Sequence, residues 1–136
     1  TPGYRRSEQE AMERAAYWLD RVELRGFANR PANTLAYGQQ RRLEIARCMV
    51  TQPKLLMLDE PAAGLNPKET DDLKALISEL RDEHQITVLL IEHDMKLVMS
   101  ISDHIVVINQ GTPLAHGTPE EIRDNPDVIK AYLGEA

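Results

Sequence analysis

A short apolar run that ends in two carboxylates constrains the fold of this chain more than any other feature. The run from Lys54 to Leu58 follows Pro53 and leads directly into Asp59 and Glu60. A continuous apolar stretch of this length is typical of a strand covered on both faces, as in a parallel sheet between helices. Since ligands bind beyond the carboxyl ends of parallel strands, we expect the two carboxylates to face a ligand.

Two helices are predicted before this strand. Ser7 and Glu10 form a possible capping box, after which apolar residues recur at helical spacing, namely Met12, Ala15, Ala16, Leu19 and Val22. Residues 26–34 read as a loop, and a second helix is expected to begin near Gly38. Its apolar face comprises Leu43, Ala46, Met49 and Val50. The only cysteine, Cys48, lies in this helix and is predicted to be a buried, inert thiol.

Helices and strands alternate after the run. Asn66, Pro67 and Glu69 occupy the N-cap, N1 and N3 positions of a helix whose apolar stripe is Leu73, Leu76, Ile77 and Leu80. The remaining predicted elements are a strand over 87–91, a helix from about Asp94, a strand over 105–108 with a turn at 109–111, a capping box at 118–121, and a short helix from Asn125 to Gly134. This order predicts an α/β fold with a largely parallel sheet.

Composition excludes several classes of protein. The 136 residues are 42% hydrophobic and 28% charged, which is typical of a folded domain. The net charge of −6 comes without a basic stripe, so we expect no binding to nucleic acid. The longest apolar stretches are far shorter than the ~18 residues of a membrane span, so any membrane association is expected to be peripheral. The chain opens without Met, and its start is expected not to be the start of the gene.

Three further motifs surround the carboxylates. Leu35-Ala36-Tyr37-Gly38-Gln39 precedes a basic helix, Gly64-Leu65-Asn66-Pro67 follows the strand, and Ile91-Glu92-His93-Asp94 follows the next one. In this order and spacing, the four motifs resemble the signature loop, Walker B strand, D-loop and switch-histidine loop of ATP-binding-cassette (ABC) ATPases. The resemblance covers nearly the whole chain. It implies the C-terminal part of a P-loop NTPase domain of the RecA-like type, with part of the helical subdomain.

The resemblance implies a role for each motif. Asp59 would hold Mg²⁺, a hard ion that keeps several waters beside phosphate oxygens, and Glu60 would orient or deprotonate the attacking water. His93 would sense the γ-phosphate. The signature and D-loop residues would contact ATP bound to the opposite subunit, because a loop at a helix N-terminus favours an anion. These ATP-contacting residues are Leu35, Ala36, Tyr37, Gly38, Gln39, Gly64, Leu65 and Asn66.

Two residues depart from the family pattern. Ala36 stands where the family usually has Ser, and Tyr37 stands where it has Gly, so a weaker contact with phosphate is expected. Simpler explanations stay open for each motif: solvated loop acids, an ordinary helix cap at Gly38 or Asn66, and a structural role for His93. The other three histidines have no spacing typical of ligands, and no zinc site is expected.

No Gly-x-x-x-x-Gly-Lys-[Ser/Thr] sequence occurs in the chain. We therefore expect a truncated piece that alone neither binds ATP tightly nor hydrolyses it. Its apolar strand would leave an open edge, which predicts self-association. By the resemblance, residues 1–50 belong to the helical subdomain and end in the signature loop and helix. Residues 51–136 belong to the ATPase core.

Within the family, residues 37–47, 59–67 and 117–135 are similar to bacterial branched-chain amino-acid importer ATPases. This implies ATP and Mg²⁺ as cofactors, a second ABC ATPase subunit in a head-to-tail dimer, and integral membrane permease subunits as partners. The protein would lie on the cytoplasmic face of the inner membrane and would not touch the transported substrate. Alternatives are a lipopolysaccharide-export ATPase, a non-transport ABC ATPase of DNA repair or ribosomes, and a non-catalytic module that donates its signature motif to a partner's ATP.

Overall fold

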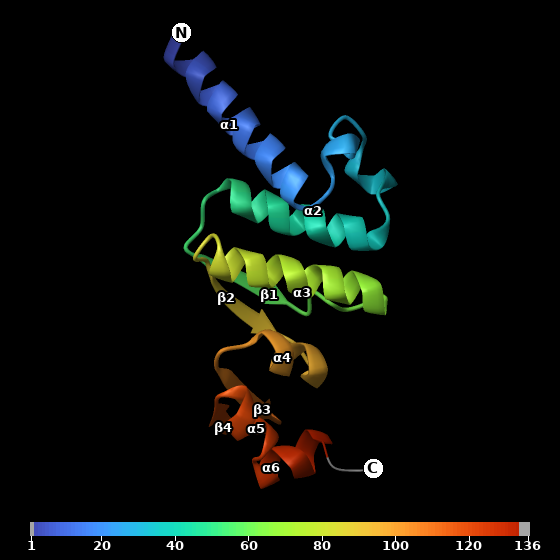
Figure 1. Ribbon diagram of the computed structural model, residues 1–136, viewed down its shortest axis with the longest axis vertical. Coiled ribbons are helices and arrows are strands. Elements are labelled where there is room, and N and C mark those ends of the chain that lie inside the picture. The colour runs from blue at the N-terminus through green and yellow to red at the C-terminus, as the bar shows by residue number, and fades with distance from the viewer. Residues whose placement is uncertain (1, 134–136) are drawn as a thin grey trace. The chain divides into compact units, whose positions relative to one another are not determined.

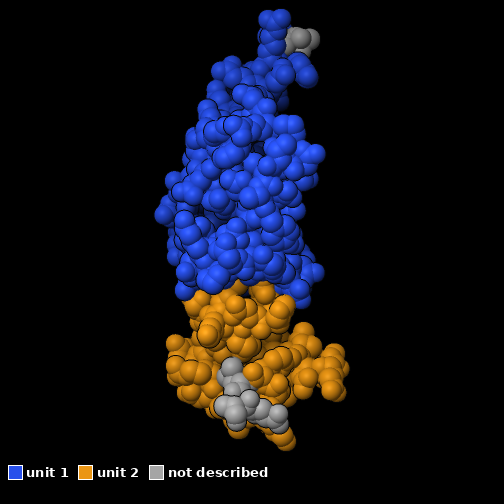
Figure 2. Space-filling view, turned by 90° about the vertical axis from the view of Figure 1, so that its right-hand side faces the viewer, with its two compact units in different colours: residues 1–91 blue, residues 92–136 orange. Residues whose placement is uncertain are grey.

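Strands and helices alternate from β1 to β3, over residues 55–109, in a computed structural model that describes residues 2–133 (Figure 1). The chain divides into a first unit, residues 1–91, and a second unit, residues 92–136, which Figure 2 colours separately. The first unit holds α1 (Pro2–Arg21), η1 (Arg25–Phe27), η2 (Ala32–Thr34), α2 (Tyr37–Val50), β1 (Leu55–Asp59), α3 (Pro67–Asp82) and β2 (Thr87–Ile91). The division at residue 50 rests on the family resemblance and stays a prediction.

Helix α1 begins earlier than the sequence pattern indicated. It starts at Pro2, a residue whose fixed φ suits the first helical position, so the predicted capping box at Ser7 is wrong. Met12 is 67% exposed, whereas Trp18 is the buried residue of the helix. Helix α1 packs against α2, and its burial is at its C-terminal end, where Val22 and Leu24 follow.

The caps and apolar stripe of α3 are confirmed. The Asn66 side chain accepts from the Glu69 N–H, and Pro67 occupies the first turn. Four side chains of the stripe are buried, with exposures of 0–6%: Leu73, Leu76, Ile77 and Leu80. Helix α2 begins at Tyr37, next to the predicted start, and buries Ile45, Ala46 and Met49. The prediction for Cys48 is wrong, because this residue lies on the exposed side of α2.

Strands β1 and β2 form a parallel pair, as predicted, with Asp59 opposite Ile91. The prediction that β1 is covered on both faces is wrong for the described chain. Leu56 is buried, but alternate residues of both strands are 49–67% exposed: Leu55, Met57, Leu89 and Ile91. One face of the pair is therefore apolar and open.

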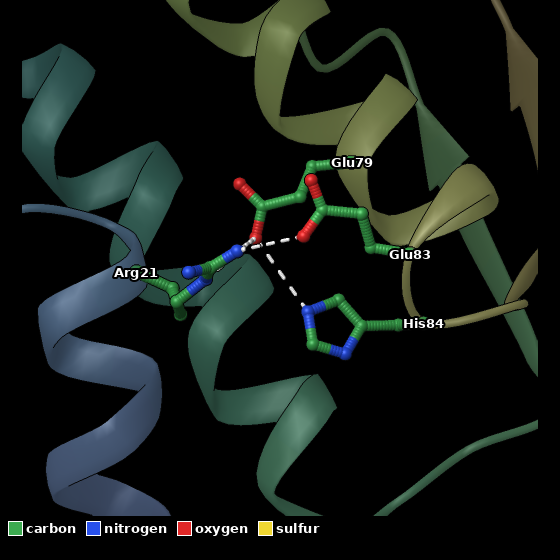
Figure 3. A network of polar contacts seen from close by, with 4 residues as sticks. All are labelled: Arg21, Glu79, Glu83 and His84. Carbon is green, nitrogen blue, oxygen red and sulfur yellow. Dashed lines mark hydrogen bonds and ion pairs between the residues drawn. The ribbon is translucent and has the colours of Figure 1, made fainter.

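A polar cluster joins the C-terminal ends of α1 and α3 (Figure 3). Arg21 Nε donates to Glu79 Oε1 at 2.6 Å, and Arg21 Nη2 lies 3.1 Å from Glu83 Oε2. The hydrogen bond to Glu79 raises the pKa of Arg21. The His84 ring lies 4.8 Å from Trp18, between centroids, so the cluster borders the aromatic residue that anchors α1.

The second unit is built around a hairpin. It holds α4 (Met95–Ile101), β3 (Ile105–Asn109), β4 (Thr112–Gly117), α5 (Pro119–Arg123), α6 (Pro126–Val128) and the π-helical turn η3 (Ile129–Leu133). Strand β4 was not predicted; it pairs antiparallel with β3, with a bulge between Val107 and Ile108. The sheet content is thus one parallel and one antiparallel pair in the part of the chain described. The buried core of the unit is Ile105, Val107, Ile122 and Val128.

The predicted starts of the helices in this unit are confirmed. Asp94 caps α4, Thr118 forms a capping box with Glu121, and Asn125 caps α6. The predicted end of the last helix at Gly134 lies outside the described residues. Among residues 2–133, no helix combines the length and apolarity needed to cross a membrane.

Candidate functional site

The predicted signature loop and D-loop meet at the N-terminal ends of α2 and α3. The two helices run side by side with these ends on the same side of the first unit (Figure 1). Two contacts join them: the ring of Tyr37 lies against Gly64, and the carboxylate of Glu69 lies against Gly38. Residues that are 27 and 31 positions apart, from 37 to 64 and from 38 to 69, therefore share one surface.

The peptide bond between Leu35 and Ala36 in the signature loop is held by two glutamine side chains of α2. Ala36 is the N-cap residue of α2, and its N–H donates to Gln39 Oε1 at 3.0 Å. Alanine has no oxygen to return this bond, so only half of a capping box forms. Gln40 Nε2 donates to the Leu35 carbonyl at 2.9 Å, and Leu35 itself is buried. Gln39, one of the residues predicted to contact ATP, therefore bonds back to the loop at Ala36.

Tyr37 is half-exposed and bonds along its own helix. Its hydroxyl accepts from Arg41 Nη2 at 2.8 Å and from Arg41 Nε at 3.1 Å, while the guanidinium lies 5.1 Å from the ring centroid. Arg41 also pairs with Glu44 at 3.0 Å. The hydrogen bonds to Glu44 and to Tyr37 raise the pKa of Arg41, which stays a cation. The Tyr37 side chain is therefore held by the Arg41 guanidinium and also packs against Gly64.

The D-loop runs from the strand-end carboxylates to α3 in tight turns. Ala63 N–H donates to the Glu60 carbonyl and Leu65 N–H to the Ala62 carbonyl, each at 3.1 Å. Gly64 has φ +77°, and a Cβ at this position would lie 3.2 Å from Tyr37 Cε1. Glycine satisfies both conditions, since it tolerates positive φ and has no side chain.

Glu69 connects α3 with α2 through Gly38, and this contact was not predicted from the sequence. Glu69 was predicted as a capping residue, and its Oε2 does accept from the Asn66 N–H at 3.0 Å. Its other oxygen lies where a side chain of residue 38 would be, 2.5 Å from an ideal Cβ. No local sequence signal points to this second contact, because it joins two helices distant in the sequence.

The two carboxylates lie at the carboxyl end of β1 as predicted, and both are exposed. Asp59 is the last residue of the strand, opposite Ile91, and the Glu60 N–H donates to the Ile91 carbonyl at 2.8 Å. Glu60 has φ 45°, in the left-handed region that non-glycine residues seldom adopt and that costs about 1–3 kcal/mol. The turn that presents Glu60 is thus stabilised from β2.

The carboxylate at the end of β1 suits a metal ion whose other ligands are waters and phosphate oxygens. Among residues 2–133, no group of three or more His, Cys, Asp or Glu residues is placed to bind a metal. A single exposed carboxylate at a strand end, such as Asp59, matches the way Mg²⁺ is held by one or two carboxylates together with waters and phosphate oxygens. A dedicated zinc or calcium cage would need more protein ligands.

His93 belongs to the second unit and is exposed. It lies two residues after the end of β2 and directly before Asp94, the N-cap of α4, whose side chain accepts from Leu97 N–H at 3.1 Å. Its own N–H donates to Glu92 Oε2 at 3.3 Å. The structure therefore brings the signature loop against the D-loop, which follows the carboxylates in the first unit, and it places His93 at the start of the second.

Two family models match the sequence. The "ABC transporter" model matches residues 1–63, and the "Branched-chain amino acid ATP-binding cassette transporter" model matches residues 112–136. The whole chain is 82% identical to the high-affinity branched-chain amino acid transport ATP-binding protein BraF of Pseudomonas aeruginosa. It is 72% identical to the high-affinity branched-chain amino acid transport ATP-binding protein LivG of Escherichia coli. The chain spans 53% of the length of each of these relatives.

Solved structures agree with this assignment. The ADP conformation of MJ1267, an ATP-binding cassette of an ABC transporter, matches with a TM-score of 0.82 at 33% identity, over 93% of this chain and 51% of that one. A nucleotide-free ATP-binding cassette matches over the same shares with a TM-score of 0.81 at 35% identity. The predicted fold class, part of a P-loop NTPase domain, is confirmed, and the chain belongs to the ATP-binding family of ABC transporters.

Proposed function

We propose that this chain is part of the ATP-hydrolysing subunit of an importer for branched-chain amino acids. The observation that carries the proposal is the meeting of the signature loop and the D-loop beside a strand that ends in two exposed carboxylates. The names of the relatives support the substrate class, and they favour it over lipopolysaccharide export. The transported amino acid would not touch this subunit.

The residues divide the work of hydrolysis. Asp59 would hold Mg²⁺, which would neutralise negative charge on the phosphates of bound ATP. Glu60 would orient or deprotonate the attacking water, and its left-handed turn, bonded to Ile91, fixes its backbone for this task. His93 would sense the γ-phosphate; it follows β2, whose last residue is opposite Asp59.

The signature loop would act on ATP held by a second ABC ATPase subunit in a head-to-tail dimer. The N-terminal N–H groups of a helix such as α2 lack partners within the helix and favour an anion. Buried Gly38 would let the backbone approach phosphate, whereas Ala36 offers no hydroxyl. The contact would then rest on backbone donors, and the partners on the membrane side would be permease subunits at the cytoplasmic face.

The test is Glu60→Gln in the full-length protein assembled with its partner subunits. ATP hydrolysis should fall by at least ~100-fold, as for loss of a general base, while ATP binding is retained. Glu120→Gln makes the same chemical change at another exposed glutamate and should leave hydrolysis unchanged. Full hydrolysis by Glu60→Gln would refute the catalytic role.

The chain of 136 residues, taken alone, is proposed to be inactive, because no phosphate-binding motif occurs in it. ATP turnover by this chain that disappears on Glu60→Gln would contradict the proposal. A second function is favoured by the intact pairing of signature loop and D-loop in one unit: the chain could donate its signature motif to a partner's ATP. Titration of an intact partner cassette with the chain would then stimulate ATP hydrolysis.

A further inference from the structure

One carboxylate touches the N-terminal ends of both helices that carry the site. Glu69 Oε2 accepts from the Asn66 N–H at 3.0 Å, and the Asn66 side chain accepts from the Glu69 N–H at 2.9 Å. These two bonds complete the cap of α3. They also fix the direction of the Glu69 side chain, because both ends of the residue are bonded to Asn66.

The same fixed side chain fills the place that a side chain of residue 38 would need. An ideal Cβ on Gly38 would lie 2.5 Å from Glu69 Oε1, 2.7 Å from its Cδ and 3.2 Å from its Cγ. Gly38 is buried within the first turn of α2, where alanine would otherwise be the better helix former. The close approach of Glu69 thus gives glycine at residue 38 a packing reason inside the same chain, in addition to the proposed contact with phosphate.

A second contact, beside that of Glu69 with Gly38, also connects the signature loop with the D-loop. The Tyr37 ring lies against Gly64, where a Cβ would be 3.2 Å from Cε1, and Arg41 Nη2 donates a hydrogen bond to the Tyr37 hydroxyl. Two neighbouring residues of α2 therefore each meet a residue of the D-loop or of the α3 N-terminus. Two such contacts restrain rotation of one loop against the other better than either alone.

We infer that Glu69 is a positioning residue that joins the signature loop to the D-loop, so that both loops move as one body. The inference rests on the proposed function for its meaning, since both loops would face ATP bound to a second subunit. Tyr37 takes part as the second contact. A partner nucleotide that displaces one loop would then displace the other.

The decisive experiment is a double-mutant cycle of Gly38→Ala and Glu69→Ala on the free energy of unfolding in the full chain. Gly38→Ala alone must push the carboxylate from its cap, and we expect the folded-to-unfolded ratio to fall about fivefold to tenfold, as for the loss of a cap. In the Glu69→Ala background the same change should raise the ratio about twofold to fivefold, as for Gly→Ala at a compatible site. Equal effects in both backgrounds would overturn the inference.

Two variants distinguish the proposed connection of the two loops through Glu69 from the ordinary capping of a helix. Glu121→Ala removes the equivalent carboxylate of the Thr118 capping box in the second unit, and it should leave the effect of Gly38→Ala unchanged. Asn66→Ala weakens the α3 cap but leaves the backbone N–H that holds Glu69. Hydrogen exchange of the Gln40 N–H, which donates to the Ala36 carbonyl at 2.9 Å, should therefore quicken in Glu69→Ala and not in Asn66→Ala. Equal acceleration in both would show capping alone.

Activity gives the last readout. In the full-length protein with its partners, Glu69→Ala should lower the turnover number several-fold and leave ATP binding to the isolated subunit unchanged. Glu69→Gln keeps the size and an oxygen of the side chain, so it should retain part of the turnover that Glu69→Ala loses. An unchanged turnover number would overturn the positioning role. If the wild-type protein hydrolyses no ATP, the proposed function fails, and the unfolding cycle still decides whether Glu69 joins the two loops.

Discussion

Asn66 closes the turn after the strand-end carboxylates by capping α3 through its side chain. Asn66→Ala should lower the free energy of unfolding by about 1 kcal/mol, because the Glu69 N–H loses its acceptor. Urea unfolding followed by circular dichroism measures the loss. Asn33→Ala, at another exposed asparagine, should change stability by less than ~0.5 kcal/mol. Equal losses in the two variants would argue against the cap.

Cys48 lies on the exposed side of α2 and is the only cysteine in the chain. An aromatic disulfide reagent should therefore modify it in the native protein at a rate close to that in denaturant. Cys48→Ser should show no modification and serves as the control. Reaction only after unfolding would mean that the thiol is covered in solution.

Among the elements, α3 carries the packing of the first unit. Leu80 is fully buried, so Leu80→Ala should cost about 2–5 kcal/mol through lost transfer energy and the cavity left behind. Leu55→Ala removes the same atoms from a side chain that is 50% exposed, and it should cost much less. Denaturant unfolding of both variants gives the comparison. Similar costs would mean that Leu55 is covered in the folded protein.

The elements that the sequence predicted well are those defined by local rules. The Asn66 and Thr118 capping boxes and the apolar stripe of α3 each depend on residues within a few positions of one another. Strand β4 was missed, since Pro113 and Gly117 are poor strand formers and the strand exists by pairing with β3. The Gly38–Glu69 contact was missed for the same reason: it depends on how two helices pack.

The catalytic and ATP-binding roles of the site residues are predictions, whereas the positions of the loops that carry them are given by the structure. The loops around Gly38 and Asn66 were located from the motif order, and the structure places them side by side. Motif spacing could not show that Tyr37, which departs from the family pattern, packs on Gly64. Tyr37 stands where the family usually has glycine, and no residue near it in the sequence indicates that its ring packs on Gly64.

At the scale of the whole molecule, the open apolar face of the β1 and β2 pair is expected to cause association in solution. Leu55, Met57, Leu89 and Ile91 form an exposed apolar patch, and such patches promote association. Light scattering should show the average mass rising with protein concentration. Met57→Lys should reduce the rise, whereas Met12→Lys, at an equally exposed methionine of α1, should not. A constant monomer mass at high concentration would contradict this prediction.

The anchoring of α1 has an optical consequence. Trp18 is the only tryptophan in the sequence, and it is buried in the first unit beside Tyr17 and His84. Tryptophan emission therefore reports on the surroundings of one helix end, within residues 1–91. Melting of the β3 and β4 hairpin in the second unit is expected to leave the tryptophan emission unchanged and to appear in the backbone circular dichroism spectrum. If the units melt at different temperatures, the two spectra will disagree.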